Sequence, residues 1–175
     1  MKKLIAFDLD GVLIDSLKNM EMSWDIVKLH HNIEVPFDEY RKHIGKPFFD
    51  ILDELGLTES QQRIKDTYDE ASNMIIDEVE IYEGAIETLE HIKEKGYKIA
   101  ICTSKDIVRV KKVIASLILD GKKFPEFDYV CSPKQGLRGK PAPDQLLNTM
   151  AFCNVDPHET YYVGDMQSDM FCANR

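Results

Sequence analysis

Residues 8–16 read Asp8-Leu9-Asp10-Gly11-Val12-Leu13-Ile14-Asp15-Ser16, and they directly follow an apolar run, Leu4-Ile5-Ala6-Phe7. The apolar run predicts a buried strand, and two carboxylates stand one residue apart at its end. Because unpaired charges beside an apolar core lose their hydration, such a pair needs a compensating partner, usually a metal ion. Alternation along a strand points Asp8 and Asp10 the same way, and Gly11 lets the backbone turn tightly. The two acids therefore converge at the carboxyl end of a first strand, where open α/β sheets place their sites.

Composition limits the classes of protein to which the chain can belong. Its 175 residues suffice for one core, or for one domain with a small insert. With 31 acidic and 22 basic residues the net charge is −9, which disfavours nucleic acids and anionic membranes as partners. No apolar run approaches the roughly 20 residues of a membrane helix, and Asp8 interrupts the N-terminal run too early for a signal peptide. The four cysteines are widely spaced without a C-x-x-C pair, so we expect buried thiols and a cytoplasmic protein.

Beyond residue 82 the sequence alternates between helical and strand-like segments. Helices are predicted at 85–95, 107–117 and 143–152, and strands at 98–103, 127–131 and 160–163. Such alternation favours a parallel sheet covered by helices on both faces, which is an α/β fold.

The segment between residues 15 and 80 contains no strand-like run. Helical spacing extends from Ser16 to His30, and Pro36 and Pro47 punctuate short helical pieces. Thr58-Glu59-Ser60-Gln61 has the pattern of a capping box, which predicts a helix from there to about Glu78. We therefore predict a small helical module at 15–82, inserted after the first strand of a core formed by 1–14 and 83–175.

Three later segments place further polar side chains at strand ends or helix starts. Thr103-Ser104-Lys105 ends one strand and leads into a helix, whose N-terminus suits an anion. Lys140 lies in Gly139-Lys140-Pro141-Ala142-Pro143-Asp144, where two prolines fix the backbone and hold an ammonium ready for a phosphate. Val163-Gly164-Asp165 ends the last strand in a carboxylate, and Asp169 follows one helical turn later.

Together these acids favour a hard cation. Mg²⁺ prefers oxygen ligands, typically one or two carboxylates, and Asp8 and Asp165 supply such a pair from two strand ends. The five histidines show no ligand spacing that would suit a softer metal; they are His30, His31, His43, His91 and His158.

In order and spacing, these four segments resemble the motifs of the haloacid dehalogenase superfamily, and more narrowly its phosphoglycolate phosphatase and β-phosphoglucomutase relatives with a helical cap. The resemblance implies a Rossmann-like sheet with flanking helices, and a Mg²⁺-dependent phosphomonoester hydrolase acting on a small phosphorylated metabolite. Asp8 would be the nucleophile and a metal ligand, and Asp10 the general acid–base, with its backbone carbonyl on the metal. Asp165 would bind Mg²⁺ directly, and Asp169 would orient the ligands or waters around that ion. Thr103, Ser104 and Lys140 would hold the transferring phosphoryl group.

The substrate itself cannot be derived from these motifs. Arg41, His43 and Lys46 lie where cap residues of such relatives reach the leaving group, although an ordinary helix–loop–helix surface explains them equally well. A sugar phosphomutase shares all four motifs, and a non-catalytic binding or regulatory module with a vestigial site is a further alternative. Dehalogenation is disfavoured because it needs neither Asp10 nor the metal.

The end of the chain is the main departure from the relatives. Only Met170 to Arg175 follow Asp169, so the C-terminal part of the core looks short, and helices of this length are marginal without tertiary support. We expect either that the natural protein is longer or that a partner subunit covers this edge, for which a homo-oligomer would suffice.

Overall fold

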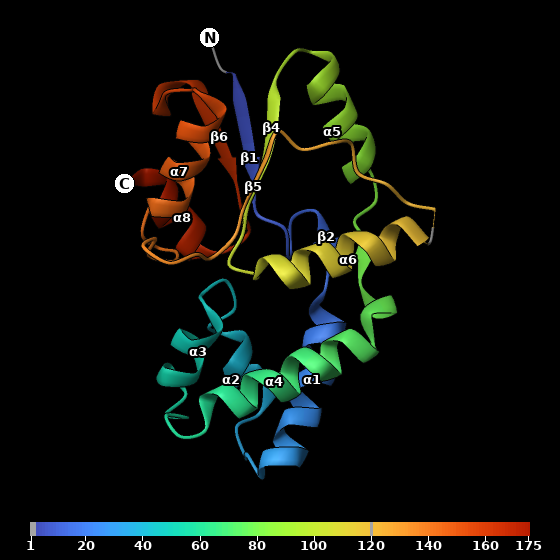
Figure 1. The fold of residues 1–175 in the computed structure, drawn as a ribbon, viewed down its shortest axis with the longest axis vertical. Coiled ribbons are helices and arrows are strands. Elements are labelled where there is room, and N and C mark those ends of the chain that lie inside the picture. The colour runs from blue at the N-terminus through green and yellow to red at the C-terminus, as the bar shows by residue number, and fades with distance from the viewer. Residues whose placement is uncertain (1–2, 120) are drawn as a thin grey trace.

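The computed structural model describes residues 3–119 and 121–175 of the chain. At its centre lies a sheet of four parallel strands in the spatial order β5-β4-β1-β6 (Figure 1). The strands are β1 (Leu4–Phe7), β4 (Lys98–Cys102), β5 (Tyr129–Cys131) and β6 (Thr160–Val163). In the register, Ala6 of β1 lies beside Ala100 of β4 and Tyr162 of β6. Because the strands run the same way, their carboxyl ends meet at one edge of the sheet.

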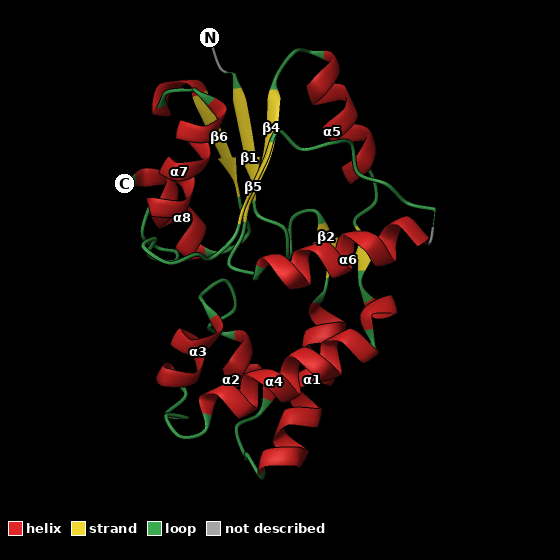
Figure 2. Cartoon of the chain, in the orientation of Figure 1, coloured by secondary structure: helices red, strands yellow, loops and turns green. Residues whose placement is uncertain are grey.

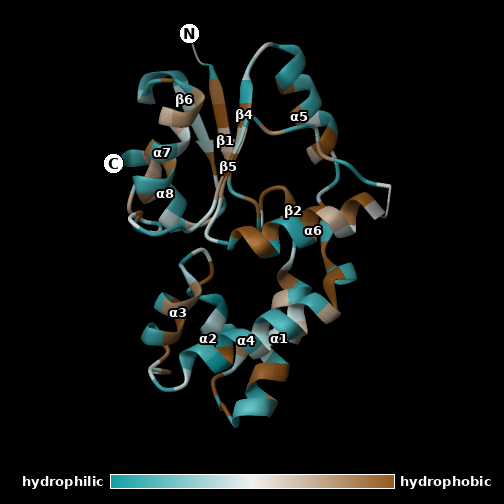
Figure 3. Cartoon of the chain, viewed as in Figure 1, coloured by the Kyte–Doolittle hydropathy of each residue, from teal (hydrophilic) through white to brown (hydrophobic). Residues whose placement is uncertain are grey.

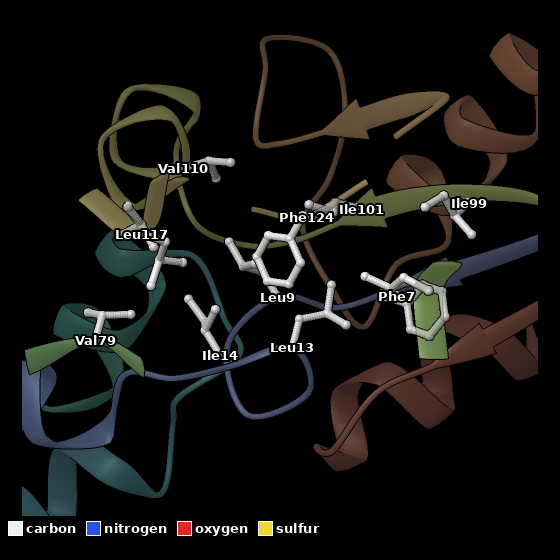
Figure 4. Packing of buried hydrophobic residues seen from close by; sticks show 12 residues of the cluster. Phe7, Leu9, Leu13, Ile14, Val79, Ile99, Ile101, Val110, Leu117 and Phe124 are labelled. Atoms are coloured by element: carbon white, nitrogen blue, oxygen red, sulfur yellow. The ribbon is translucent and has the colours of Figure 1, made fainter. Parts of the chain in front are cut away.

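One face of the sheet carries large aliphatic side chains. Ile99 and Ile101 of β4 belong to a buried cluster with Leu89 of α5 (Ala85–Glu94) and Val110 of α6 (Ile107–Leu119). Figure 4 shows this cluster from close by. In Figure 3 hydrophobic and hydrophilic segments alternate along α5 and α6, as expected for helices that bury one side. Burial of these side chains holds both helices against the sheet.

The opposite face carries the alternate, smaller residues of the same strand, because successive side chains of a strand point to opposite faces. Ala100 and Cys102 belong to a cluster with Leu146 of α7 (Asp144–Cys153) and Cys172 of α8 (Gln167–Asn174). Figure 1 shows α7 and α8 on one side of the sheet and α5 on the other. The predicted α/β fold with a parallel sheet flanked by helices is therefore confirmed.

Two short antiparallel strands connect the sheet to a separate group of helices. Ile14 of β2 (Ile14–Asp15) lies opposite Ile81 of β3 (Glu80–Ile81). Figure 2 shows the helices between these strands gathered at the far end of the molecule from the sheet. We call them the helical unit; they are α1 (Leu17–His31), α2 (Phe37–Arg41), α3 (Phe48–Glu54), α4 (Gln61–Met74) and the 3-10 turn η1 (Ile76–Glu78).

The helical unit has an aromatic core of its own. The rings of Trp24 and Tyr40 stack with centroids 4.5 Å apart, and the ring of Tyr68 lies 6.0 Å from that of Tyr40. The indole Nε1 of Trp24 donates to the carbonyl oxygen of Val35 at 2.9 Å, so its one polar atom is satisfied inside the core. This unit is therefore internally packed.

The last helix of this unit differs from the prediction at both ends. Helix α4 begins after Ser60, which is left-handed (φ 55°) and makes no side-chain cap, so the predicted capping box is wrong. The helix ends at Met74 rather than near Glu78, and η1 follows. Asn19 of α1 donates from Nδ2 to the carbonyl oxygens of Ser72 and Ile75 at 3.0 and 2.9 Å. A side chain on another helix thus satisfies carbonyls at this terminus, which local sequence does not reveal.

The four cysteines are buried thiols, as predicted. Within the described residues, no helix is both long and apolar enough to span a membrane. The boundaries predicted for core (1–14 and 83–175) and cap (15–82) stay a prediction, and residues 1, 2 and 120 of that core lie outside the described residues.

Candidate active site

A pocket of about 200 Å³ lies between the carboxyl ends of the strands and the helical unit. Asp8 and Asp10 reach it after β1, Thr103 and Ser104 after β4, and Asp165 after β6. The helical unit contributes a mainly apolar wall, which includes Met20, Tyr40, Ile44, Phe48 and Tyr68. Parallel strand ends therefore bring five of the residues singled out in the sequence around one cavity.

Asp8 lies almost completely out of water, with 4% of its surface exposed. Its Oδ1 accepts a hydrogen bond from the backbone N–H of Leu9 at 2.7 Å, and its Oδ2 lies 2.9 Å from Nζ of Lys140. Burial raises the pKa of Asp8 to about 6, although the nearby Lys140 opposes that shift. At neutral pH the carboxylate is mostly ionised, held by a cation on one side.

Lys140 bridges two carboxylates although its side chain is fully buried. Its Nζ lies 2.9 Å from Oδ2 of Asp8 and 2.7 Å from Oδ1 of Asp169. Burial alone would lower the pKa of Lys140, but the two carboxylates outweigh it and raise that pKa. Asp169 is held in turn, because the Tyr162 hydroxyl donates to its Oδ1 and the Met166 N–H to its Oδ2, each at 3.0 Å. The ammonium is thus fixed close to Asp8.

Three carboxylates offer a place for a hard cation. Asp8, Asp165 and Asp169 each present an oxygen, and these oxygens lie within 4.8 Å of one another. An all-oxygen donor set of this kind fits Mg²⁺. Burial raises the pKa of Asp165, although the nearby Lys140 opposes that shift. Both oxygens of Asp169 already accept hydrogen bonds, and those of Asp8 contact the Leu9 N–H and the Lys140 ammonium, so Asp165 is the most accessible carboxylate of the three.

Gly11 is the residue against which the Asp165 side chain rests. It has a left-handed backbone (φ 76°), and a Cβ added there would lie 2.3 Å from Oδ2 of Asp165. Since the obstructing atom is the tip of a side chain, the carboxylate can move aside, but it then leaves its position beside Asp8.

Replacing Gly11 with alanine is therefore expected to weaken Mg²⁺ binding by roughly 10- to 100-fold, the usual effect of displacing a group that supports a metal site. The matched control is Gly56→Ala, because Gly56 has a similar φ of 73° with no atom near an added Cβ. Both variants should lose about 1–2 kcal/mol from left-handed strain. Calorimetric Mg²⁺ titration and urea denaturation separate the two effects. Equal Mg²⁺ affinity in the two variants would show that Gly11 does not position Asp165.

Asp10 is fixed from two directions through the same oxygen. Its Oδ1 accepts a hydrogen bond from the hydroxyl of Ser16 and lies 3.1 Å from Nζ of Lys105. Burial lowers the pKa of Lys105, and Asp10 opposes that shift. Asp10 thus lines the pocket with its side chain held by Ser16 and by the buried Lys105.

The two hydroxyl residues after β4 have different surroundings. Thr103 is buried, and its Oγ1 accepts a hydrogen bond from the N–H of Lys105 at 3.1 Å. The Ser104 hydroxyl donates to the carbonyl oxygen of Gly45 at 2.6 Å, across to the helical unit. Thr103 thus shapes the loop, whereas Ser104 links the sheet to the opposite wall.

The three residues singled out on the helical unit are not equivalent. Lys46 lines the pocket, and its Nζ contacts both carboxylate oxygens of Glu54 at 2.6 and 2.7 Å. His43 pairs with the same Glu54, and Arg41 is exposed; neither lines the pocket. The structure brings only Lys46 of these three to the cavity.

Sequence reasoning missed the ion pairs across the pocket. Arg109 of α6 contacts Asp69 of α4 at 3.6 Å and donates from Nη2 to the Ser72 hydroxyl at 2.6 Å. The guanidinium also lies 5.0 Å from the centre of the Tyr68 ring. The available signal was an arginine among the apolar residues of α6, and Lys105 likewise had no role assigned within Thr103-Ser104-Lys105.

Comparison with known proteins agrees with this geometry. Residues 5–175 match the sequence model of the family described as haloacid dehalogenase-like hydrolase. A phosphoglycolate phosphatase of Aquifex aeolicus is 27% identical over 99% of this chain and 80% of its own length. The pyrophosphatase PpaX of Bacillus mycoides is 29% identical over 95% of this chain and 76% of its own. A solved hydrolase from Pseudomonas syringae superposes with a TM-score of 0.85 at 26% identity, covering 99% of this chain and 80% of that one.

Proposed function

Because this chain belongs to the haloacid dehalogenase-like hydrolase family, we propose that it hydrolyses the phosphomonoester of a small metabolite through a phosphoryl group carried on Asp8. Support comes from Asp8 itself, which is buried at the pocket, 2.9 Å from the Lys140 ammonium, with the Asp165 carboxylate at the same edge. A carboxylate held this way can serve as a nucleophile toward phosphorus.

The first step joins Asp8 to phosphorus. A carboxylate oxygen of Asp8 forms the new P–O bond while the P–O bond to the leaving alcohol breaks. Asp10 donates a proton to the departing oxygen, so the product leaves as a neutral alcohol. Lys140 and the loop at Thr103 and Ser104 would bind the phosphoryl oxygens.

The second step returns the enzyme to its starting state. Asp10, now a carboxylate, takes a proton from water, and the water oxygen attacks phosphorus. The bond between Asp8 and phosphorus breaks, and inorganic phosphate leaves. One residue thus acts first as acid and then as base.

Mg²⁺ is the cofactor that this donor set fits. Asp8, Asp165 and the backbone carbonyl of Asp10 would hold it, and Asp169 would orient the surrounding groups. When bound, a divalent cation offsets the negative charge of a phosphate dianion and so lets a carboxylate approach it.

The helical unit would act as a cap that excludes bulk water and large substrates. Contacts already cross the pocket, from Ser104 to Gly45 and from Arg109 to Asp69. A cavity of about 200 Å³ closed in this way accommodates a small leaving group. The relatives named above act, by their names, on phosphoglycolate and pyrophosphate, which are both small.

The proposal is tested by measuring inorganic phosphate released from a panel of small phosphomonoesters, with Mg²⁺ and with EDTA. We expect release only with Mg²⁺, and little release by Asp165→Asn. Thermal-shift titration should show that Mg²⁺ stabilises the wild-type protein more than this variant. Equal activity with EDTA would contradict the metal dependence, and phosphoryl transfer to a sugar without phosphate release would indicate a mutase.

Mg²⁺ binding should weaken as the pH falls. Burial raises the pKa values of Asp8, to about 6, and of Asp165. Since the metal binds the deprotonated carboxylates, protons compete with it below that pKa. Between pH 7 and pH 5 the Mg²⁺ dissociation constant should rise roughly 10-fold from Asp8 alone. Calorimetric titrations in buffers of different ionisation enthalpy measure both the constant and the protons released; a constant affinity without proton release would contradict this.

A further inference from the structure

Lys105 is a buried lysine for which the reaction outlined above has no use. Only 4% of its side chain is exposed, and its Nζ lies 3.1 Å from Oδ1 of Asp10. Its backbone N–H donates to Oγ1 of Thr103, which ties the residue to the end of β4. Burying an ammonium is unfavourable unless a partner compensates for the lost hydration, and here the partner is Asp10.

The groups around Lys105 determine the direction in which its ammonium points. The positive charge of Arg109 repels the Lys105 ammonium, whereas the carboxylates of Asp10 and Asp106 attract it. Asp106 also approaches Lys65, with 3.8 Å between its Oδ2 and the Lys65 Nζ. Asp10 is therefore the partner that Lys105 contacts directly.

The two oxygens of Asp10 are not equivalent in this arrangement. Oδ1 is contacted by Lys105 and by the hydroxyl of Ser16. Across the described residues, Oδ2 accepts no hydrogen bond from the protein, and Asp10 lines the pocket. An ammonium has donors only, so a proton on Oδ1 would face a cation. Oδ2 is therefore the oxygen of Asp10 that remains free to exchange a proton with substrate or water.

We propose that Lys105 is a positioning residue for acid–base catalysis: it holds Asp10 through Oδ1, so that Oδ2 is the oxygen through which Asp10 gives a proton to the leaving group and later takes one from water. This inference rests on the proposed function. In each turnover the Oδ2 proton moves to the leaving oxygen as its bond to phosphorus breaks, and a water proton replaces it. Lys105 keeps its own protons throughout.

The test compares two leaving groups in single-turnover reactions of the full chain with Mg²⁺. An alkyl phosphate needs its departing oxygen protonated, whereas p-nitrophenyl phosphate expels a stable anion and needs little protonation. For Lys105→Met we expect the alkyl phosphate rate to fall roughly 10- to 100-fold, a part of what general acid–base catalysis contributes. The p-nitrophenol burst should change by less than about 3-fold, and KM should stay similar.

Three further variants separate positioning from other roles. Lys105→Arg keeps the charge and should recover part of the lost rate, and it is the second probe if Lys105→Met fails to fold. In an Asp10→Asn background, Lys105→Met should cause no further loss, because the two residues act as a unit. Lys98→Met is the charge control, since the Lys98 ammonium binds the Cys153 carbonyl oxygen outside the pocket.

The outcomes distinguish this inference from the function beneath it. Equal losses for both leaving groups, or a rise in KM alone, would overturn the role of Lys105 while leaving the phosphatase assignment intact. A wild-type protein that hydrolyses neither substrate would contradict the proposed function, and this inference with it.

Discussion

The Asp8→Asn variant is expected to lose at least about 10⁴-fold in phosphatase activity, since removing a nucleophile removes the covalent route altogether. An amide is a poor nucleophile, and it also supplies a weaker ligand than a carboxylate. The fold should persist, because Lys140 keeps its contact with Asp169 at 2.7 Å. Phosphate release, combined with mass spectrometry to exclude deamidation, measures the effect. Turnover near the wild-type rate would remove Asp8 from the reaction.

The control for this variant is Asp10→Asn, which keeps the nucleophile. It should slow both formation and breakdown of the phosphoryl intermediate, by roughly 10²–10⁴-fold. Asp10→Asn should therefore form some labelled protein with a phosphorylated substrate, whereas Asp8→Asn should form none. Labelling of Asp8→Asn would show that another residue carries the phosphoryl group.

The second large effect is expected from Lys140→Met, and it concerns stability as well as activity. Asp8 and Asp169 would then lie buried without the cation that separates them. Breaking such a buried pair from one side costs roughly 3–5 kcal/mol of the free energy of unfolding. Urea denaturation at pH 7 with EDTA measures this loss. The matched control is Lys46→Met, whose pair with Glu54 is partly exposed and should change stability by less than about 1 kcal/mol.

The loss in Lys140→Met should shrink as the pH falls. Burial already raises the pKa of Asp8 to about 6 in the presence of Lys140, and removing the cation raises it further. A carboxyl whose folded pKa exceeds its unfolded value binds more protons when folded, so the destabilisation grows as pH rises through that window. Comparing urea midpoints at pH 5 and pH 7 tests the sign. A loss that is equal at both values would mean that Lys140 acts through packing alone.

Local sequence was sufficient to predict the layered architecture, in which helices cover both faces of a parallel sheet. A strand must alternate its side chains, so the aliphatic Ile99 and Ile101 and the small Ala100 and Cys102 meet different helices. Parallel strands end at one edge, which is why Asp8, after β1, and Asp165, after β6, approach each other. Helix ends were predicted less well: the capping pattern at Thr58 did not form, and Asn19 of a distant helix satisfies the carbonyls at the end of α4.

By itself, then, the sequence determined the parallel α/β sheet and the gathering of acids at its carboxyl edge, since both follow from strand periodicity and chain direction. Tertiary structure alone decided which charge pairs with which: Lys140 with Asp8 and Asp169, and Lys105 with one oxygen of Asp10. It also decided that Lys46, and neither Arg41 nor His43, lines the pocket. The physical reason is the separation along the chain over which each effect acts. Periodicity acts over neighbouring residues, whereas an ion pair depends on burial and on distances of a few ångströms between segments far apart in the chain.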